Sequence, residues 1–283
     1  MSATEVILST RVGGREIQLS RPVSLAIDLD FCKDQPRHFG APRASTRPFA
    51  VPGFSGSVGQ GASCNCHILT LIPHCNGTHT ECVGHLTREP IDAHRVVPLG
   101  LVPAFLVSIE PIDARTSDES TEPSPQPSDQ LITRQALEGH WLKTKSAAPL
   151  EPRALVIRTL PNHPTKQHQD YTNQTPPYLS REAAQFLVER GIEHLVIDTP
   201  SIDRAHDEGR LTAHRIFFGL PRGDTTLGHA TRANATVTEL AYVPDPVTDG
   251  PCFLEIQVPA LGGDAVPSRP LLYPVFSWPI LSG

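Results

Sequence analysis

A twelve-residue segment from His74 to His85, with the sequence HCNGTHTECVGH, restricts the fold more than any other part of the chain. It supplies six potential metal ligands: three imidazoles, two thiols and one carboxylate. Soft and borderline donors at this density bind a transition metal far more often than they pack a core. Gly77 lies where the backbone must bend so that the donors on either side face one ion. The segment therefore points to a metal-dependent enzyme.

Four donors of this segment, Cys75, His79, Glu81 and His85, follow one another at intervals of four, two and four residues. The even step from His79 to Glu81 places both side chains on one face of an extended strand. Gly77 allows Cys75 to turn toward them, and zinc binding would deprotonate its thiol. We expect the two histidines and Glu81 to bind a divalent ion, with Cys75 as an additional ligand. The alternative is a polar loop that carries these donors by chance.

Composition excludes several classes of function. The 283 residues are enough for a buried core, in one large domain or two small ones. The net charge of −6 and the lack of a basic run argue against nucleic-acid binding, which needs clustered Lys and Arg. No apolar run approaches the ~20 residues that span a bilayer, and charged residues within positions 1–18 are atypical of a signal peptide. We therefore expect a cytoplasmic protein without membrane or nucleic-acid partners.

The sequence pattern predicts more strands than helices, and the 29 prolines favour turns over long helices. Strands are expected at residues 23–31, 66–72, 154–159, 194–198, 236–243 and 253–258, with a hairpin within 6–19. Residues 133–142 and 180–190 should form helices, the second capped by Ser180 and ended by Gly191. Because this second helix lies between two buried strands, it predicts a β-α-β crossover in an α/β protein with a mixed sheet.

Two polar segments are expected to lie outside the core. Residues 37–61 are rich in proline, glycine and serine and should form a long loop over the site. Residues 116–129 (TSDESTEPSPQPSD) have low complexity and several acids, which predicts a mobile surface insertion.

The metal-binding segment resembles the pattern His-x-Gly-Thr-His-x-Asp-x-Pro-x-His of the cyclase family of metal-dependent hydrolases, which includes bacterial kynurenine formamidases and isatin hydrolases. Residues 77–79 and His85 match at the same offsets. Cys75 stands where the family has its first His, and Glu81 stands where it has Asp. His74 would replace Cys75 as the first ligand if the turn shifted by one residue.

The resemblance extends over roughly residues 20–275. The further matches are ALVIRT at 154–159, YLS at 178–180, VIDTPSID at 196–203, TEL at 238–240 and the segment 264–270. They imply a swivelling β/β/α fold, with a barrel-like mixed sheet and flanking helices, in which residues 1–283 form a single domain.

The resemblance also implies that a downstream His and a late Glu complete the metal site. Glu239 matches the late Glu, and His214 is the first candidate for the His, with His229 as the competing one. The family places the two closer in sequence than 214 and 239 are here. Residues 219–230 are therefore expected to be an insertion.

These ligands permit hydrolysis. A bound divalent ion lowers the pKa of its water toward ~7, and His85 or Glu239 can take a proton and return it to a leaving amine. A thiolate at Cys75 favours Zn over Mn, in a site for one or two ions, but weakens the ion as a Lewis acid. The longer side chain of Glu81 can shift a bridging ligand out of place.

We therefore expect a metal-dependent hydrolase that cleaves a C–N bond in an amide or cyclic amide, with an aryl formamide as the leading small-molecule substrate. The family resemblance implies a homodimer or higher homo-oligomer. Two alternatives stay open: a non-catalytic metal or small-molecule binding protein with the same fold, and a metal-dependent lyase or dehydratase.

Overall fold

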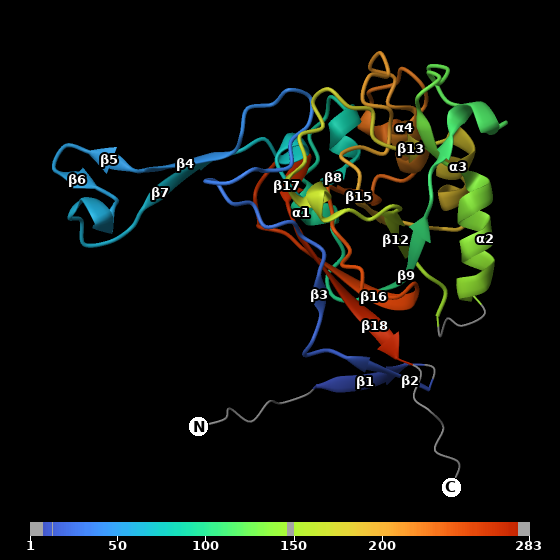
Figure 1. Cartoon of the computed structure of the whole chain (residues 1–283), viewed down its shortest axis with the longest axis horizontal. Coiled ribbons are helices and arrows are strands. Elements are labelled where there is room, and N and C mark those ends of the chain that lie inside the picture. The colour runs from blue at the N-terminus through green and yellow to red at the C-terminus, as the bar shows by residue number, and fades with distance from the viewer. Residues whose placement is uncertain (1–7, 13, 146–149, 277–283) are drawn as a thin grey trace, which may run out of the picture.

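A computed structural model describes residues 8–12, 14–145 and 150–276, and a large mixed sheet dominates them (Figure 1). This sheet has eleven strands in the order β1-β2-β18-β16-β9-β12-β14-β15-β8-β17, with β3 paired to β18. The strands are β1 (Ser9–Val12), β2 (Arg15–Gln18), β3 (Val23–Ser24), β8 (His79–Cys82), β9 (Val102–Ile109), β12 (Ala154–Thr159), β14 (His194–Ile197), β15 (Thr236–Glu239), β16 (Gly250–Gln257), β17 (Ala265–Pro267) and β18 (Arg269–Phe276). The helices are α1 (Ala93–Val96), α2 (Arg134–Lys145), α3 (Arg181–Glu189) and α4 (Thr212–Phe218).

The centre of the sheet is parallel and its flanks are antiparallel. Strands β9, β12, β14 and β15 run parallel, whereas β16 and β8 pair antiparallel with the outer members of this group. Helix α3 connects the parallel neighbours β12 and β14, which confirms the predicted crossover. The expectation of an α/β protein with a mixed sheet is confirmed.

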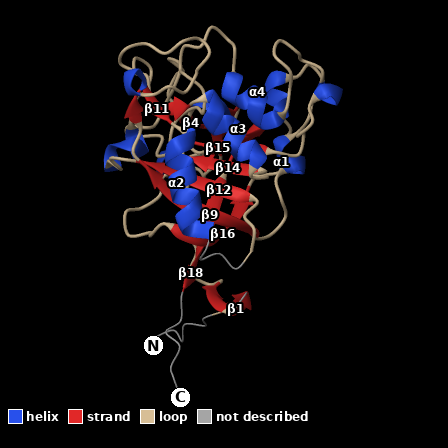
Figure 2. Cartoon of the chain, turned by 90° about the vertical axis from the view of Figure 1, so that its right-hand side faces the viewer, coloured by secondary structure: helices blue, strands red, loops and turns tan. Residues whose placement is uncertain are grey.

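Alternate residues of the central strands enter two separate cores. On β12, Leu155 and Ile157 pack with the apolar faces of α2, α3 and α4, which cover one side of the sheet (Figure 2). Ala154 and Val156 point to the other side and pack with residues of β16 and β18. This period of two, with both sets buried, is what a strand covered on both faces requires. No helix of the described residues is long and apolar enough to cross a bilayer.

The sheet curves around the second core. Strand β3 pairs with β18, and two residues further on Ala26 forms a bridge with Ala241, just beyond the end of β15. Leu25 lies between these contacts and is fully buried. The short segment after β2 thus links strands from distant parts of the sheet order.

Part of the predicted long loop forms an arm instead. Strands β4 (Ser45–Pro48) and β7 (His67–Thr70) pair, as do β5 (Ala50–Val51) and β6 (Phe54–Ser55), and together they project from the body (Figure 1). The alternation of polar and apolar residues in this stretch is weak, which is why its composition indicated a loop. Residues 37–44 stay near the body, where the His38 N–H donates to the Cys75 carbonyl at 3.2 Å.

A separate three-stranded sheet flanks the acidic segment 116–129. It consists of β10 (Ile112–Asp113), β11 (Gln130–Ile132) and β13 (Tyr178–Leu179). Within the segment, Glu119 accepts N–H bonds at the start of α2, and Asp129 pairs with Arg204 at 2.7 Å. Glu122 reaches three arginines. Its acids therefore tie this segment to the body, which the composition did not indicate.

Helix and strand ends follow local chemistry. Strand β12 has the predicted bounds, and α3 begins after Ser180, whose hydroxyl accepts from the Ala183 N–H at 2.9 Å. Helix α2 runs three residues beyond the predicted end, to Lys145. The predicted strand 23–31 is reduced to Val23–Ser24, because only its start has a strand partner.

Candidate metal centre

Strand β8 and the turn before it bring the predicted ligands into the sheet. The chain passes through a short 3-10 turn at Pro73–Cys75 and then through Gly77, whose φ of 93° lies in the left-handed region that favours glycine. Strand β8 pairs antiparallel with β15, and this register sets His79 directly opposite Glu239. The pairing of these two strands thus brings together two residues that are 160 positions apart in the sequence.

His79, Glu81 and Glu239 form the first donor group. One ligand atom from each lies within 4.8 Å of the others, and all three side chains are buried. His79 Nε2 is 3.4 Å from Glu239 Oε2. The other carboxylate oxygen of Glu239 accepts from the Ile202 N–H at 2.8 Å, which fixes its orientation.

Helix α4 adds His214 to this group. Its Nε2 is 2.7 Å from Glu81 Oε1 and 3.5 Å from Glu239 Oε1. Its Nδ1 is 2.7 Å from Asp203 Oδ2, and Asp203 also accepts the N–H groups of Ala213 and His214. Asp203 therefore positions both the start of α4 and the imidazole ring.

His74, Glu81 and His85 form the second donor group, so Glu81 belongs to both. His74 Nδ1 is 2.9 Å from Glu81 Oε2. Asp264 lies beside both histidines, 2.8 Å from His74 Nε2 and 3.5 Å from His85 Nδ1. The rings of His74 and His85 are about one quarter exposed, so this side of the cluster opens to solvent.

The buried carboxylates Glu81 and Glu239 have no lysine or arginine partner in the described part of the chain. Within the described residues, no Lys or Arg forms an ion pair with Glu81 or Glu239; only imidazoles do. Burial opposes ionisation of Glu81, but the charges of His85 and His214 outweigh it and hold its pKa well below the usual value. Burial also disfavours a charged His74, yet hydrogen bonds to Asp264 and Glu81 raise its pKa to about 10. Burial likewise opposes a charged His214, but the charge of Glu81 and a hydrogen bond to Asp203 raise its pKa. Without a metal, protons on His74 and His214 therefore balance these acids.

The donor set fits a divalent ion. Three buried atoms have no hydrogen bond: His79 Nε2, Glu81 Oε1 and His214 Nε2. The last two are close, at 2.7 Å, but lack hydrogen-bond geometry. Buried charged groups are normally paired or bind a metal, and imidazole with carboxylate suits Zn and also Mn. A cation would satisfy all three atoms at once.

The predicted ligands do not all meet. His79, Glu81, His85, His214 and Glu239 come together. Cys75 belongs to neither donor group; its thiol is buried, and burial, followed by the charge of Glu239, raises its pKa. The structure instead places the neighbouring His74 in the second group. His229 is exposed and pairs with Asp224, so it lies apart from the cluster.

Three residues beside the cluster, Asp203, Asp264 and His38, were not predicted to contact the metal ligands. Asp203 and Asp264 lie in segments that matched the family pattern, which could have identified them as partners of the histidines. His38 carried no sequence signal. Its ring is buried, neither nitrogen has a hydrogen bond, and burial lowers its pKa to about 4. The charges of Glu239 and His79 reach it, so it borders the cluster.

Comparisons with known proteins identify the family and the fold of this chain. The model of the cyclase family, described as "Putative cyclase", matches residues 17–204, more than half of the chain. Isatin hydrolase A from Ralstonia solanacearum aligns with a TM-score of 0.56 at 15% identity, over 89% of this chain and 91% of its own. Isatin hydrolase A from Labrenzia aggregata, bound to benzyl benzoate, aligns at 0.55 and 15%, over 89% and 93%.

A structure described as a predicted metal-dependent hydrolase from Bacillus stearothermophilus aligns with a TM-score of 0.54 at 16% identity, over 89% of this chain and 98% of its own. At these identities the likeness shows a shared fold. No curated protein matches the sequence.

Proposed function

This chain belongs to the cyclase family, and we propose that it is a metal-dependent hydrolase that cleaves the C–N bond of a cyclic amide. The observation that carries the proposal is the convergence of two donor groups on one shared carboxylate, Glu81. The isatin hydrolases with the same fold support the substrate class, since isatin contains a cyclic amide. An aryl formamide is the second substrate in this proposal.

Each donor group would hold one ion. His79, Glu81 and Glu239, together with His214, would hold the first, and Glu81 would share a second with His74 and His85. We propose Zn, with Mn as the second choice, because each donor group contains imidazole nitrogens, which suit Zn, beside carboxylate oxygens, which also suit Mn. A divalent ion, when bound, polarises a carbonyl and lowers the pKa of water. The longer side chain of Glu81 keeps its carboxylate within both groups.

The two proposed catalytic residues have different surroundings. His85 lies at the solvent-facing side, and Asp264 is placed to orient its ring. When only the first ion is bound, the His85 ring is free to accept a proton and pass it to a leaving amine. Glu239 is buried, and one of its oxygens accepts from the Ile202 backbone. We assign the proton to His85 and a binding role to Glu239.

Cys75 motivates a second candidate function, a non-catalytic metal-binding protein. It replaces a histidine of the family pattern, and its thiol lies outside both donor groups. A protein in which a family ligand had been replaced in this way would still bind the ion but would no longer catalyse hydrolysis.

Two histidines provide a matched test of the site. His214→Asn should abolish metal content and hydrolysis of isatin, whereas His229→Asn, which removes an exposed ring paired with Asp224, should leave both unchanged. Activity of the wild type should disappear with a chelator and return with Zn. Metal without turnover of isatin, an aryl formamide or other amides would favour the binding protein. Equal metal content in both variants would reject the site.

The assembly and the domain limits remain proposals of the same kind. We propose a homo-oligomer built from single-domain chains, with a small-molecule substrate as the other partner. Light scattering at several protein concentrations would test the oligomer, and a concentration-independent monomer mass would reject it.

A further inference from the structure

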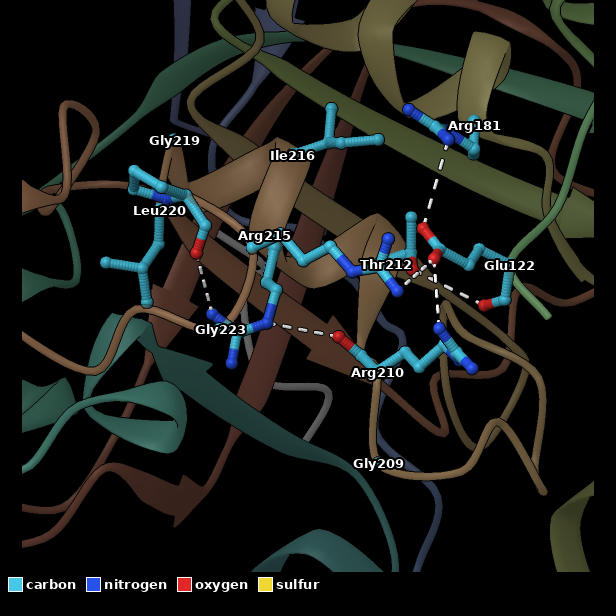
Figure 3. A pocket seen from close by; sticks show the side chains of 12 residues that line it. Glu122, Arg181, Gly209, Arg210, Thr212, Arg215, Ile216, Gly219, Leu220 and Gly223 are labelled. Atoms are coloured by element: carbon cyan, nitrogen blue, oxygen red, sulfur yellow. Dashed lines mark hydrogen bonds and ion pairs between the residues drawn. The ribbon is translucent and has the colours of Figure 1, made fainter.

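A second candidate site lies beside helix α4, and it is lined by arginines where the metal centre is lined by carboxylates. Thr212, Arg215 and Ile216 of α4 line a cavity of about 610 Å³ (Figure 3). His214 from the same helix joins the metal-site cluster instead. A volume of this size is typical of small-molecule sites, which range over roughly 300–1,000 Å³. None of the residues proposed to hold metal lines this cavity.

Four arginines line the cavity, Arg181, Arg210, Arg215 and Arg222, and Glu122 is the only carboxylate among its lining residues. Figure 3 shows Arg181 and Arg210 pointing toward Glu122. Glu122 lies 2.7 Å from Arg222, 3.0 Å from Arg210 and 3.9 Å from Arg181. Together with Glu208, which pairs with Arg210 at 2.7 Å, it supplies two negative charges against three cations. The chain as a whole has a net charge of −6, so this local positive excess does not reflect a basic protein.

Arg215 adds a charge that the protein does not neutralise. Its guanidinium donates to the carbonyl oxygens of Arg210, Pro221 and Asp224. Among the residues that the structure describes, no carboxylate lies within ion-pair distance of the Arg215 guanidinium. Arg210, by contrast, has a second carboxylate partner in Glu208. The carbonyl groups hold the Arg215 side chain in place at the cavity without cancelling its charge.

We propose that this cavity binds a small dianion, either a phosphate-type group or a dicarboxylate. Guanidinium groups bind both through paired, charge-assisted hydrogen bonds, because their planar donors match two oxygens. Ile216 and Leu220 form an apolar wall that can accept the short body of such a molecule. The site is independent of the hydrolysis proposed above.

The cavity is lined in part by two polar segments outside the central sheet. Glu122 comes from the acidic segment 116–129, and Gly219 to Gly223 belong to the segment 219–230. The sequence predicts both segments to be insertions, the first from its composition and the second from the spacing of His214 and Glu239. The cavity therefore lies where two predicted insertions meet α4.

Replacing Glu122 and replacing an arginine should change dianion affinity in opposite directions, which gives a test of the proposal. Glu122 contacts the arginines that a dianion would use, so it competes with the ligand. Removing its charge in Glu122→Gln should tighten dianion binding, while removing a cation in Arg222→Gln should weaken it about tenfold, the loss of one charge-assisted contact. Arg95→Gln is the matched control: the Arg95 side chain is 74% exposed and pairs with Asp92, while that of Arg222 is 71% exposed.

The measurement is isothermal titration of inorganic phosphate and, separately, of succinate into the wild type and the three variants. We expect saturable binding that is weakened in Arg222→Gln, strengthened in Glu122→Gln and unchanged in Arg95→Gln. Phosphate held only at the metal centre would not respond to Arg222. Thermal unfolding of each variant checks that it is folded.

Binding of phosphate alone would assign a phosphate-type ligand, and binding of succinate alone a dicarboxylate. The proposal is overturned if neither anion binds the wild type at millimolar concentration. It is equally overturned if Arg95→Gln weakens binding as much as Arg222→Gln does.

Discussion

Helix α4 separates two charged regions that differ mainly in burial. On one side, His214 meets Glu81 and Glu239, and all three side chains are almost fully buried. Near the cavity, Arg222 and its neighbours are partly exposed to water. Buried carboxylates without a basic partner must take up protons or a cation, because an unpaired charge is costly away from water. Hydrated guanidinium groups have no such need, so we expect tight cation binding on one side and weaker anion binding on the other.

The shared carboxylate gives the largest expected effect. Glu81→Gln removes a charge from both donor groups, and we expect metal affinity to fall at least ~100-fold, because even an outer hydrogen-bond partner of a ligand is worth 10–100-fold. Competition with a chromogenic chelator would measure this. Arg222→Gln, near the other side of α4, should keep wild-type metal affinity. A comparable loss in both variants would show that the two regions are not separate.

A smaller effect is expected at the positioning residue. Asp203→Asn weakens the contact with His214 Nδ1, and we expect metal affinity to fall roughly 10–100-fold. The control is Asp207→Asn, since Asp207 accepts backbone N–H groups of Gly209 and Leu211 in the same loop without touching His214. Equal metal affinity in the two variants, at matched thermal stability, would reduce Asp203 to a purely structural role.

The two regions should also differ in their response to pH. His74 has a pKa raised to about 10, so at pH 7 its ring carries a proton that the metal must displace. Metal affinity should therefore rise with pH up to about 10, by about tenfold per unit for each proton released. Succinate binding at the arginines should stay flat wherever succinate is a dianion, because guanidinium does not titrate. Metal affinity that did not change from pH 6 to 9 would contradict this assignment.

The smallest effect is expected at Cys75. Its thiol lies outside both donor groups, so Cys75→Ser should change metal affinity less than about twofold, while His74→Gln should weaken it clearly. The same chelator competition distinguishes the two residues. A large loss in the serine variant would restore Cys75 as the first ligand, as the sequence spacing predicted.

Local patterns made much of the fold predictable. Strand β12 is a short and mostly apolar run, and helix α3 has an apolar face and a serine cap, so their positions could be predicted from the sequence. Strand β7 lies within the strand expected at 66–72, but its partner β4 could not be predicted, because β4 lies in a stretch rich in proline, glycine and serine and the pairing joins segments about twenty residues apart. Pairing between such segments depends on backbone geometry rather than on composition.

The candidate site shows the same limit. The spacing around Gly77 indicated His79, Glu81 and His85, but it could not decide between His74 and Cys75. His74 and Cys75 are neighbours in one turn, and the backbone dihedral angles of that turn decide which of the two side chains points toward the cluster. That turn is the 3-10 turn at Pro73–Cys75. The role of Asp264 depends on β17 pairing with β8, a contact that no local pattern reveals.

The most direct test of the central claim is elemental analysis of the protein purified without chelator. The two donor groups predict one or two equivalents of Zn per chain, with Mn as the replacement when Zn is scarce, and near-background metal in Glu81→Gln. A wild-type protein that is folded, contains no divalent metal and takes up none when titrated with Zn or Mn would contradict the account.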